Sequence, residues 1–141
     1  MKGFVASQSV LIRASPARVW EALTDPALVR QYLFGTEVES DWIVGSPIRY
    51  RGVWQGRAYE DKGEVLEVVP ERLLDTSYWS GMSGLPDIPE NYKNVRYELV
   101  PEGDGTRLTV TQDNNATEEE RDHSEGNWRI VLGMLKAVLE K

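Results

Sequence analysis

The aromatic residues are the side chains of this sequence that most suggest binding chemistry. The chain holds five Trp and six Tyr but only two Phe. Trp and Tyr are bulky and have a polar end that needs a hydrogen-bond partner, so they suit the wall of a ligand site better than a dry core. The alternation of side chains along the predicted strands turns several of these aromatic residues inward, together with the side-chain amide of Gln112. We predict that the following residues bind a ligand: Tyr50, Trp54, Tyr78, Trp79, Tyr97, Gln112 and Trp128. A solid aromatic core is the alternative for each.

Gln112 is the polar member of this predicted set. It has the same parity as Leu108 and Val110, which places its side chain inside near the end of a strand. A buried amide must find hydrogen-bond partners. Gln112 therefore either orients a ligand or bonds to backbone near Asn114 and Asn115.

Tyr78 and Trp79 are neighbours, so only one of them can face inward. We favour Tyr78, because the opposite parity would bury Asp75. A bulge would exchange Tyr78 for Trp79.

No group of residues indicates a catalytic or metal site. Cys is absent, and the single histidine, His123, lies among acidic residues that we expect to be solvated. Glu60, Asp61 and Glu64 fall at the start of a predicted strand, where exposure costs less than burial. We find no nucleophile with its base and no ligand set with metal-binding spacing. We therefore predict a binding protein rather than an enzyme, with no catalytic residue, no metal and no cofactor.

The charge and the hydropathy of the sequence limit the classes of partner that we expect. The net charge is −7 and the pI is near 4.8, which argues against nucleic acid and against an anionic membrane surface. No window approaches the roughly 20 apolar residues of a spanning helix, and residues 1–9 lack the apolar core of a signal peptide. We expect one cytoplasmic domain over residues 1–141, and its oligomeric state stays open.

One long helix and a series of strands must position these residues. Apolar residues recur at helical spacing from Trp128 to Leu139, and Thr117 with Glu120 forms a capping-box pattern, which predicts a helix over residues 117–141. Residues 47–113 are typical of consecutive antiparallel strands, with turns at Gln55-Gly56 and Gly103-Asp104-Gly105 and a bulge within residues 65–69.

The start of the chain predicts a strand followed by two short helices. Residues 4–13 are strand-like. Ser15-Pro16 and Asp25-Pro26 each place an N-cap residue before a proline, which is typical of helix starts. Gly35 should end the second helix.

A long loop lies between two of the predicted strands, from Ser80 to Asn94. It contains Gly hinges, stiffening prolines and the apolar side chains of Met82, Leu85 and Ile88. Long ordered loops are often functional. We predict a lid over a cavity mouth formed by these three apolar residues, and the alternative is a plain surface connection.

The sequence resembles a known superfamily over almost its whole length. The segments SPARVWEALTDPALVRQYLFG, VGSPIRYRGVWQGRAYEDKGEVLEVVPERLLDTSYW, YELVPEGDGTRLTVTQDN and NWRIVLGMLKAVLEK occur in the order of the START-like (SRPBCC) superfamily. Within it, the chain is most similar to the family related to the heat-shock-protein-90 ATPase activator. The resemblance implies an α+β helix-grip fold: a curved antiparallel sheet wrapped around a long C-terminal helix, with two short helices after the first strand.

Three functions follow from these expectations. The leading hypothesis is a carrier or sensor that binds an apolar or aromatic small molecule between the sheet and the C-terminal helix. The resemblance also implies a chaperone-associated interaction module with a role in the stress response. A third possibility from the superfamily is an enzyme of the aromatic-cyclase type. A cavity of a few hundred cubic ångströms would favour the first or third over the second.

Overall fold

Seven strands form one antiparallel sheet in a computed structural model that describes all residues, 1–141. The strands are β1 (Phe4–Ile12), β2 (Glu37–Glu39), β3 (Pro47–Trp54), β4 (Arg57–Val69), β5 (Leu73–Tyr78), β6 (Lys93–Glu102) and β7 (Gly105–Asn115). Their order across the sheet is β1-β7-β6-β5-β4-β3-β2. Every neighbouring pair is antiparallel, and only β1 joins the sheet out of sequence order.

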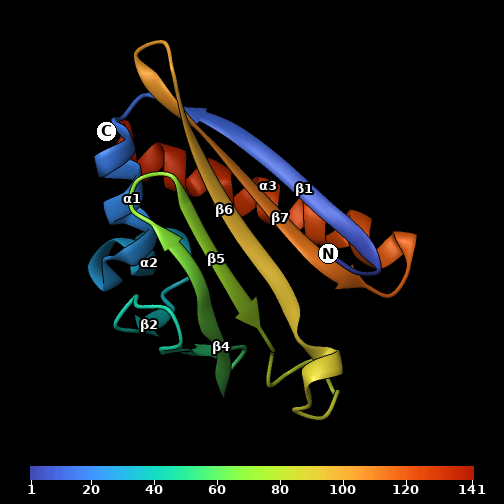
Figure 1. The fold of residues 1–141 in the computed structure, drawn as a ribbon. Helices are drawn as coiled ribbons and strands as arrows, with labels where there is room; N and C mark the ends of the chain where they lie inside the picture. The colour runs from blue at the N-terminus through green and yellow to red at the C-terminus, as the bar shows by residue number, and fades with distance from the viewer.

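Three α-helices cover one face of this curved sheet: α1 (Pro16–Thr24), α2 (Pro26–Tyr32) and α3 (Glu118–Leu139). A short 3-10 helix, η1 (Pro89–Asn91), lies in the loop between β5 and β6. Figure 1 shows α3 running lengthwise beside β1 and β7, with α1 and α2 at one end of the sheet. The predicted helix-grip fold is confirmed.

Local capping explains where α1 and α2 begin. The Ser15 hydroxyl accepts a hydrogen bond from the backbone N–H of Arg18. The Asp25 carboxylate accepts one from the backbone N–H of Ala27. A proline follows each cap at the first helical position. The Tyr32 hydroxyl, at the end of α2, donates to the carbonyl oxygen of Ala22 in α1 over 2.8 Å. This bond holds the two helices together as one bent unit.

Helix α3 begins with the predicted capping interactions. The Thr117 hydroxyl accepts from the backbone N–H of Glu120 over 3.1 Å. The Glu120 carboxylate accepts in return from the backbone N–H of Ala116 over 2.8 Å, one residue earlier than the usual capping box. The helix then presents one apolar stripe to the sheet, with Val131, Leu132 and Leu135 buried and with Trp128 and Leu139 half-buried.

The turns and the bulge of the sheet also follow the predicted pattern. Gln55 and Gly56 both have positive φ, 50° and 76°, as a tight hairpin turn between β3 and β4 requires. The pairing of β4 with β5 shifts register between Val65 and Glu67, which is the predicted bulge. Strand β2 was not predicted, because its three residues are too few to show a period of two.

The solid part of the core lies where α1 packs on α3, β6 and β7. Ile12, Val19, Ala22 and Leu108 are fully buried there. Closer to the N-terminus of α3, the helix and the sheet are separated by a cavity, which is described next.

Candidate functional site

A cavity of about 430 Å³ lies between the sheet, α2 and α3. Apolar side chains form most of its wall. Leu23 and Val29 come from the two short helices, Leu132 and Leu135 from α3, and Val95 from β6. The C-terminal helix therefore closes a core at one end and lines a hollow at the other.

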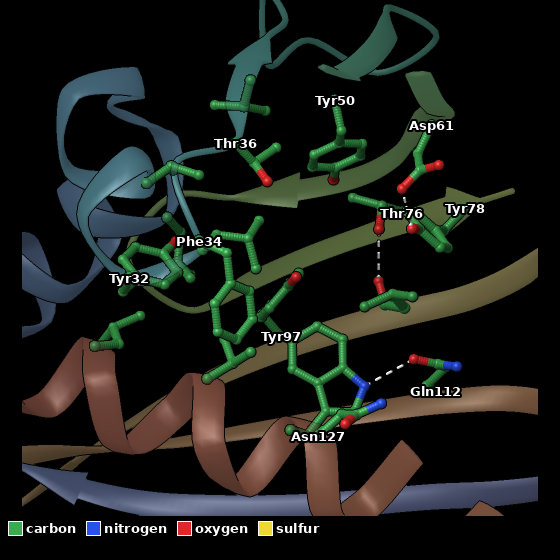
Figure 2. Close-up of a pocket in the computed structure, with 18 of the residues that line it drawn as sticks. Tyr32, Phe34, Thr36, Tyr50, Asp61, Thr76, Tyr78, Tyr97, Gln112 and Asn127 are labelled. Carbon is green, nitrogen blue, oxygen red and sulfur yellow. Dashed lines mark hydrogen bonds between the residues drawn. The ribbon is translucent and has the colours of Figure 1, made fainter. Parts of the chain in front are cut away.

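Tyrosines from three strands bring hydroxyl groups to this apolar wall. Tyr50 comes from β3, Tyr78 from β5 and Tyr97 from β6. The Tyr50 and Tyr78 rings meet edge to face at 5.7 Å between centroids, and Tyr97 meets Trp128 in the same way at 6.0 Å. The hydroxyls of Tyr50 and Tyr97 form no hydrogen bond within the chain, and Figure 2 shows both pointing into the cavity. A ligand could occupy their free bonding positions.

These hydroxyls are held in the protonated form. Burial raises the pKa of Tyr32, Tyr50, Tyr78 and Tyr97 far above the ordinary value for tyrosine. The negative charge of Asp61 raises the pKa of Tyr50 and Tyr78 further. The cavity thus offers neutral hydroxyl groups that can donate or accept.

Asp61 is a buried carboxylate in the cavity wall, and the expectation that it would be exposed is wrong. Its Oδ2 accepts from the Tyr78 hydroxyl over 2.5 Å, and its Oδ1 accepts from the backbone N–H of Gly81 over 3.0 Å. Glu60 and Glu64 are exposed as expected. A signal was present in the sequence, because Asp61 has the same parity as Val65, which is fully buried in the same strand.

Gln112 lies in the cavity wall, and its side chain has a partner that the sequence did not reveal. Its Oε1 accepts from the indole Nε1–H of Trp128 over 2.7 Å (Figure 2). The predicted alternative of a bond to backbone near Asn114 and Asn115 is wrong. The Nε2 donor group of Gln112 forms no bond within the chain and remains available to a ligand.

The mouth of the cavity is lined by apolar side chains that are largely exposed. Trp54 is 54% exposed, and Phe34, Val53 and Met82 are also exposed while lining the same space. Trp54 is therefore a residue of the rim and not of the interior. It lies at the end of β3, where the hairpin turn to β4 leaves one side open to solvent.

Three of the predicted site residues lie outside the cavity wall: Trp79, Leu85 and Ile88. Trp79 follows the last residue of β5 and pairs with Lys62 through an isolated bridge. The Lys62 Nζ lies 5.7 Å from the centroid of its ring. Tyr78 is thus the inward-facing member of the pair, as the sequence favoured. The reason given for that choice was wrong, because Asp75 is buried even so, outside the cavity wall, with the Asn94 amide donating to its carboxylate. The ligand-binding role of the whole predicted set stays a prediction.

After the isolated bridge at Trp79, the loop between β5 and β6 spans Ser80–Tyr92 and ends two residues earlier than predicted, because β6 begins at Lys93. All three predicted lid residues are exposed, and only Met82 lines the cavity. Asp87 anchors the rest of the loop by accepting from the Tyr92 hydroxyl over 2.6 Å and by pairing with Lys62. Any gating action therefore belongs to the first residues of this loop.

Several wall residues escaped the sequence prediction: Tyr32, Thr36, Tyr59, Asp61 and Thr76. The Thr36 and Tyr59 hydroxyls lie 2.6 Å apart, which joins the segment after α2 to β4. The parity of Tyr59 in its strand was a usable signal. The positions of Tyr32 and Thr36 depend on how α2 docks on the sheet, and no local pattern encodes that.

Outside the cavity wall, three sequence expectations can be compared with the structure. No group of three or more His, Cys, Asp or Glu side chains could hold a metal ion. His123 is exposed on the first turns of α3. None of the helices has both the length and the apolar character that crossing a membrane would require.

The family comparison matches residues 13–140 to the model described as Activator of Hsp90 ATPase homolog 1-like protein. Among solved structures, ChR145 from Cytophaga hutchinsonii is 44% identical to this chain, with a TM-score of 0.86. The match covers 99% of this chain and 97% of ChR145. No curated protein matches the chain.

Two more distant structures share the fold. The Aha1 dimer from Colwellia psychrerythraea is 20% identical with a TM-score of 0.74, and the match covers 97% of this chain and 96% of that one. DynU16, from the dynemicin biosynthetic locus, is 23% identical with a TM-score of 0.81. The match covers 97% of this chain but only 47% of DynU16, so this chain spans about half the length of that protein.

Proposed function

This chain belongs to the Activator of Hsp90 ATPase homolog 1-like family of the START-like superfamily, and from that premise we propose that it binds an apolar or aromatic small molecule as a carrier or sensor. The binding site is the cavity between the sheet and α3.

The observation that carries the proposal is the combination of a large apolar hollow with a few unpaired polar groups. A volume of about 430 Å³ falls within the range of small-molecule sites, roughly 300–1,000 Å³. A close-packed interior would leave few voids larger than a water molecule. The free hydroxyls of Tyr50 and Tyr97 and the free amide N–H of Gln112 supply the small number of polar contacts that orient a ligand.

Tryptophan fluorescence tests this proposal directly, because Trp42, Trp54 and Trp128 line the cavity. We expect members of a panel of apolar and aromatic compounds to quench this fluorescence and to raise the melting temperature. Trp54→Ala should weaken binding through lost contact area. Trp79→Phe, outside the wall, is the matched control and should bind as the unaltered protein does. A panel that produces neither quenching nor a thermal shift would argue against a carrier.

The substitution Gln112→Leu tests whether the Gln112 side chain orients a ligand bound in this cavity. It removes a polar group from the wall and preserves most of the side-chain volume, so we expect a change in the ranking of ligands larger than the change in mean affinity. A uniform loss of affinity for all ligands would indicate a structural effect through the bond to Trp128.

A chaperone-associated interaction module is the second candidate, and the family description favours it. Exposed apolar side chains would suit contact with another protein: Phe34 at the cavity mouth, and Ile43 and Val44 in the segment between β2 and β3. On this candidate the protein acts in the cytoplasm in a stress response. Stimulation of a heat-shock-protein-90 ATPase by this protein, lost in Phe34→Ala, would support it over the carrier.

A cyclase-type enzyme is the third candidate. Asp61 and Tyr78 form a hydrogen-bonded carboxylate and hydroxyl pair inside an apolar cavity, and such pairs can move protons. A carrier releases its ligand unchanged. Mass spectrometry of a bound compound before and after incubation therefore separates the two.

A further inference from the structure

We infer that the cavity selects its ligand by charge: it takes an apolar ring system that carries an amine or hydroxyl donor next to Asp61, and it rejects carboxylates. This inference rests on the proposed function and names the ligand class of the same site.

Asp61 is the one charged side chain in the cavity wall, because no Lys, Arg, His or Glu lines it. The cations beside Asp61 and beside Tyr50, its partner across the β3–β4 pair, are engaged elsewhere. Lys62 pairs with Asp87, while Arg49 and Arg51 pair with Glu60 on the outer face. An anionic ligand would lose its hydration beside a like charge, with no cation to compensate.

The Asp61 carboxylate has hydrogen-bonding capacity left for a ligand. Each of its oxygens accepts one bond, from the Tyr78 hydroxyl and from the Gly81 N–H. A carboxylate oxygen can accept a second bond. A ligand N–H or O–H placed there would form a charge-assisted bond, which is shorter and stronger than a bond between neutral groups. The two existing bonds fix the carboxylate in place, so it need not rearrange when a ligand arrives.

The aromatic side chains of the wall favour the same kind of ligand. The faces of Tyr and Trp rings carry partial negative charge and attract cations. Tyr50 and Tyr78 lie in edge-to-face contact on the Asp61 side of the cavity, and Figure 2 shows the three residues grouped at one end. The tyrosine hydroxyls cannot supply a positive charge in any protonation state. Both the carboxylate and the rings around it therefore act against an anion.

Three probes of matched size test the inference: 1-naphthylmethylamine, 1-naphthalenemethanol and 1-naphthoic acid. They share one ring system and carry a cation, a neutral hydroxyl and an anion. Isothermal titration calorimetry at neutral pH should rank the amine tightest and the acid weakest. We expect the amine and the acid to differ by roughly tenfold to a hundredfold in Kd, as one charge-assisted hydrogen bond would give.

Asp61→Asn removes the charge and keeps the shape of the side chain. In this variant the amine should bind roughly tenfold more weakly, and the acid should bind about as tightly as the alcohol. Glu60→Gln is the matched control. It removes one negative charge from the adjacent, outward-facing residue and should leave the ranking unchanged. Comparing these two variants separates the local effect of Asp61 from the general attraction of cations to a protein with a net charge of −7.

The outcomes distinguish this inference from the proposed function. Equal affinity for the three probes, or tightest binding of the acid, overturns the charge selection while ligand binding stands. A ranking that changes equally in Asp61→Asn and Glu60→Gln also overturns it, because net charge would then be the cause. If neither these probes nor the apolar panel binds, the proposed function fails and the inference fails with it. Should Asp61→Asn not fold, the ranking of the three probes on the unaltered protein is measured at low and at high salt, because salt screens exposed surface charges far more than a buried one. A ranking that disappears at high salt overturns the inference.

Discussion

Tyrosine hydroxyls give this cavity polarity without adding charge. A phenolate in the apolar wall would lose its hydration, so burial raises the pKa of Tyr50 and Tyr97 well above the usual value. Asp61 acts in the same direction on Tyr50, because a second negative charge nearby is unfavourable. The side chains therefore remain hydrogen-bonding groups, and the one carboxylate sets the sign of the local field.

The raised tyrosine pKa values predict a loss of stability in alkali. Their stabilising contribution is complete below about pH 10, where tyrosines in the unfolded chain begin to ionise. Above that pH, the unfolded chain releases protons that the folded protein retains. The free energy of unfolding should then fall with pH, with a slope per buried tyrosine that grows from about 0.7 kcal/mol per pH unit at pH 10 toward a limit of about 1.4. Urea denaturation measured between roughly pH 10 and 11 gives this slope.

Tyr97→Phe is the test variant for this slope. It removes one buried ionisable hydroxyl that has no partner within the chain. The alkaline slope of the variant should be shallower than that of the unaltered protein by one tyrosine's contribution, while the two should differ little in slope near neutral pH. Parallel alkaline slopes would show that Tyr97 does not stay protonated in the folded protein.

At the scale of elements, helix α3 serves two purposes along one apolar stripe. Its residue Leu135 is 1% exposed and belongs to both the core and the cavity wall. Leu135→Ala should lower the free energy of unfolding by about 2–5 kcal/mol, because it removes buried methyl groups and leaves a void. Ile130→Ala, on the exposed side of the same helix, should change it by about 0.5 kcal/mol or less. Equal denaturation midpoints in the two variants would contradict this division of the helix.

The loop Ser80–Tyr92 divides in a similar way. Met82 and Ile88 are both exposed, but Met82 lines the cavity mouth and Ile88 lies outside the wall. If the loop controls exchange, Met82→Ala should speed ligand release measured by stopped-flow fluorescence, because an apolar side chain no longer covers the opening. Ile88→Ala should leave the release rate unchanged. Faster release in both variants, or in neither, would remove the gating role from Met82.

At the scale of the whole molecule, the sheet has a covered side and an open side. Helix α3 lies along β1 and β7 (Figure 1), while the β3–β4 hairpin tip borders the cavity mouth and residues 53–58 are all exposed. A tip of this kind has few buried contacts to resist local opening. The fold thus combines a firm scaffold with an adaptable entrance.

Hydrogen exchange can measure this difference. Amides of residues 53–58 should exchange faster than those in the middle of β6 and β7. A saturating ligand should slow exchange at the tip more than elsewhere, because Val53 and Trp54 line the mouth. Uniform protection across the sheet, with or without ligand, would contradict an adaptable entrance.

The sequence alone determined the elements, because their signals are local. Ser15-Pro16 and Asp25-Pro26 cap helices within two or three residues, and Gln55-Gly56 turns a hairpin within its own backbone. Strand parity, another local property, also placed Tyr50 and Gln112 in the wall correctly. These features require no knowledge of what packs against them.

The tertiary structure alone decided whether the interior is hollow and which polar group enters it. Asp61 is tolerated inside because Tyr78 and Gly81, distant along the chain, satisfy its oxygens. Gln112 finds Trp128 on a different element for the same reason. Burial depends on partners that only the folded chain brings together, and the free energy of a buried polar group changes sign with their presence. The charge of the cavity is therefore a property of the assembled fold.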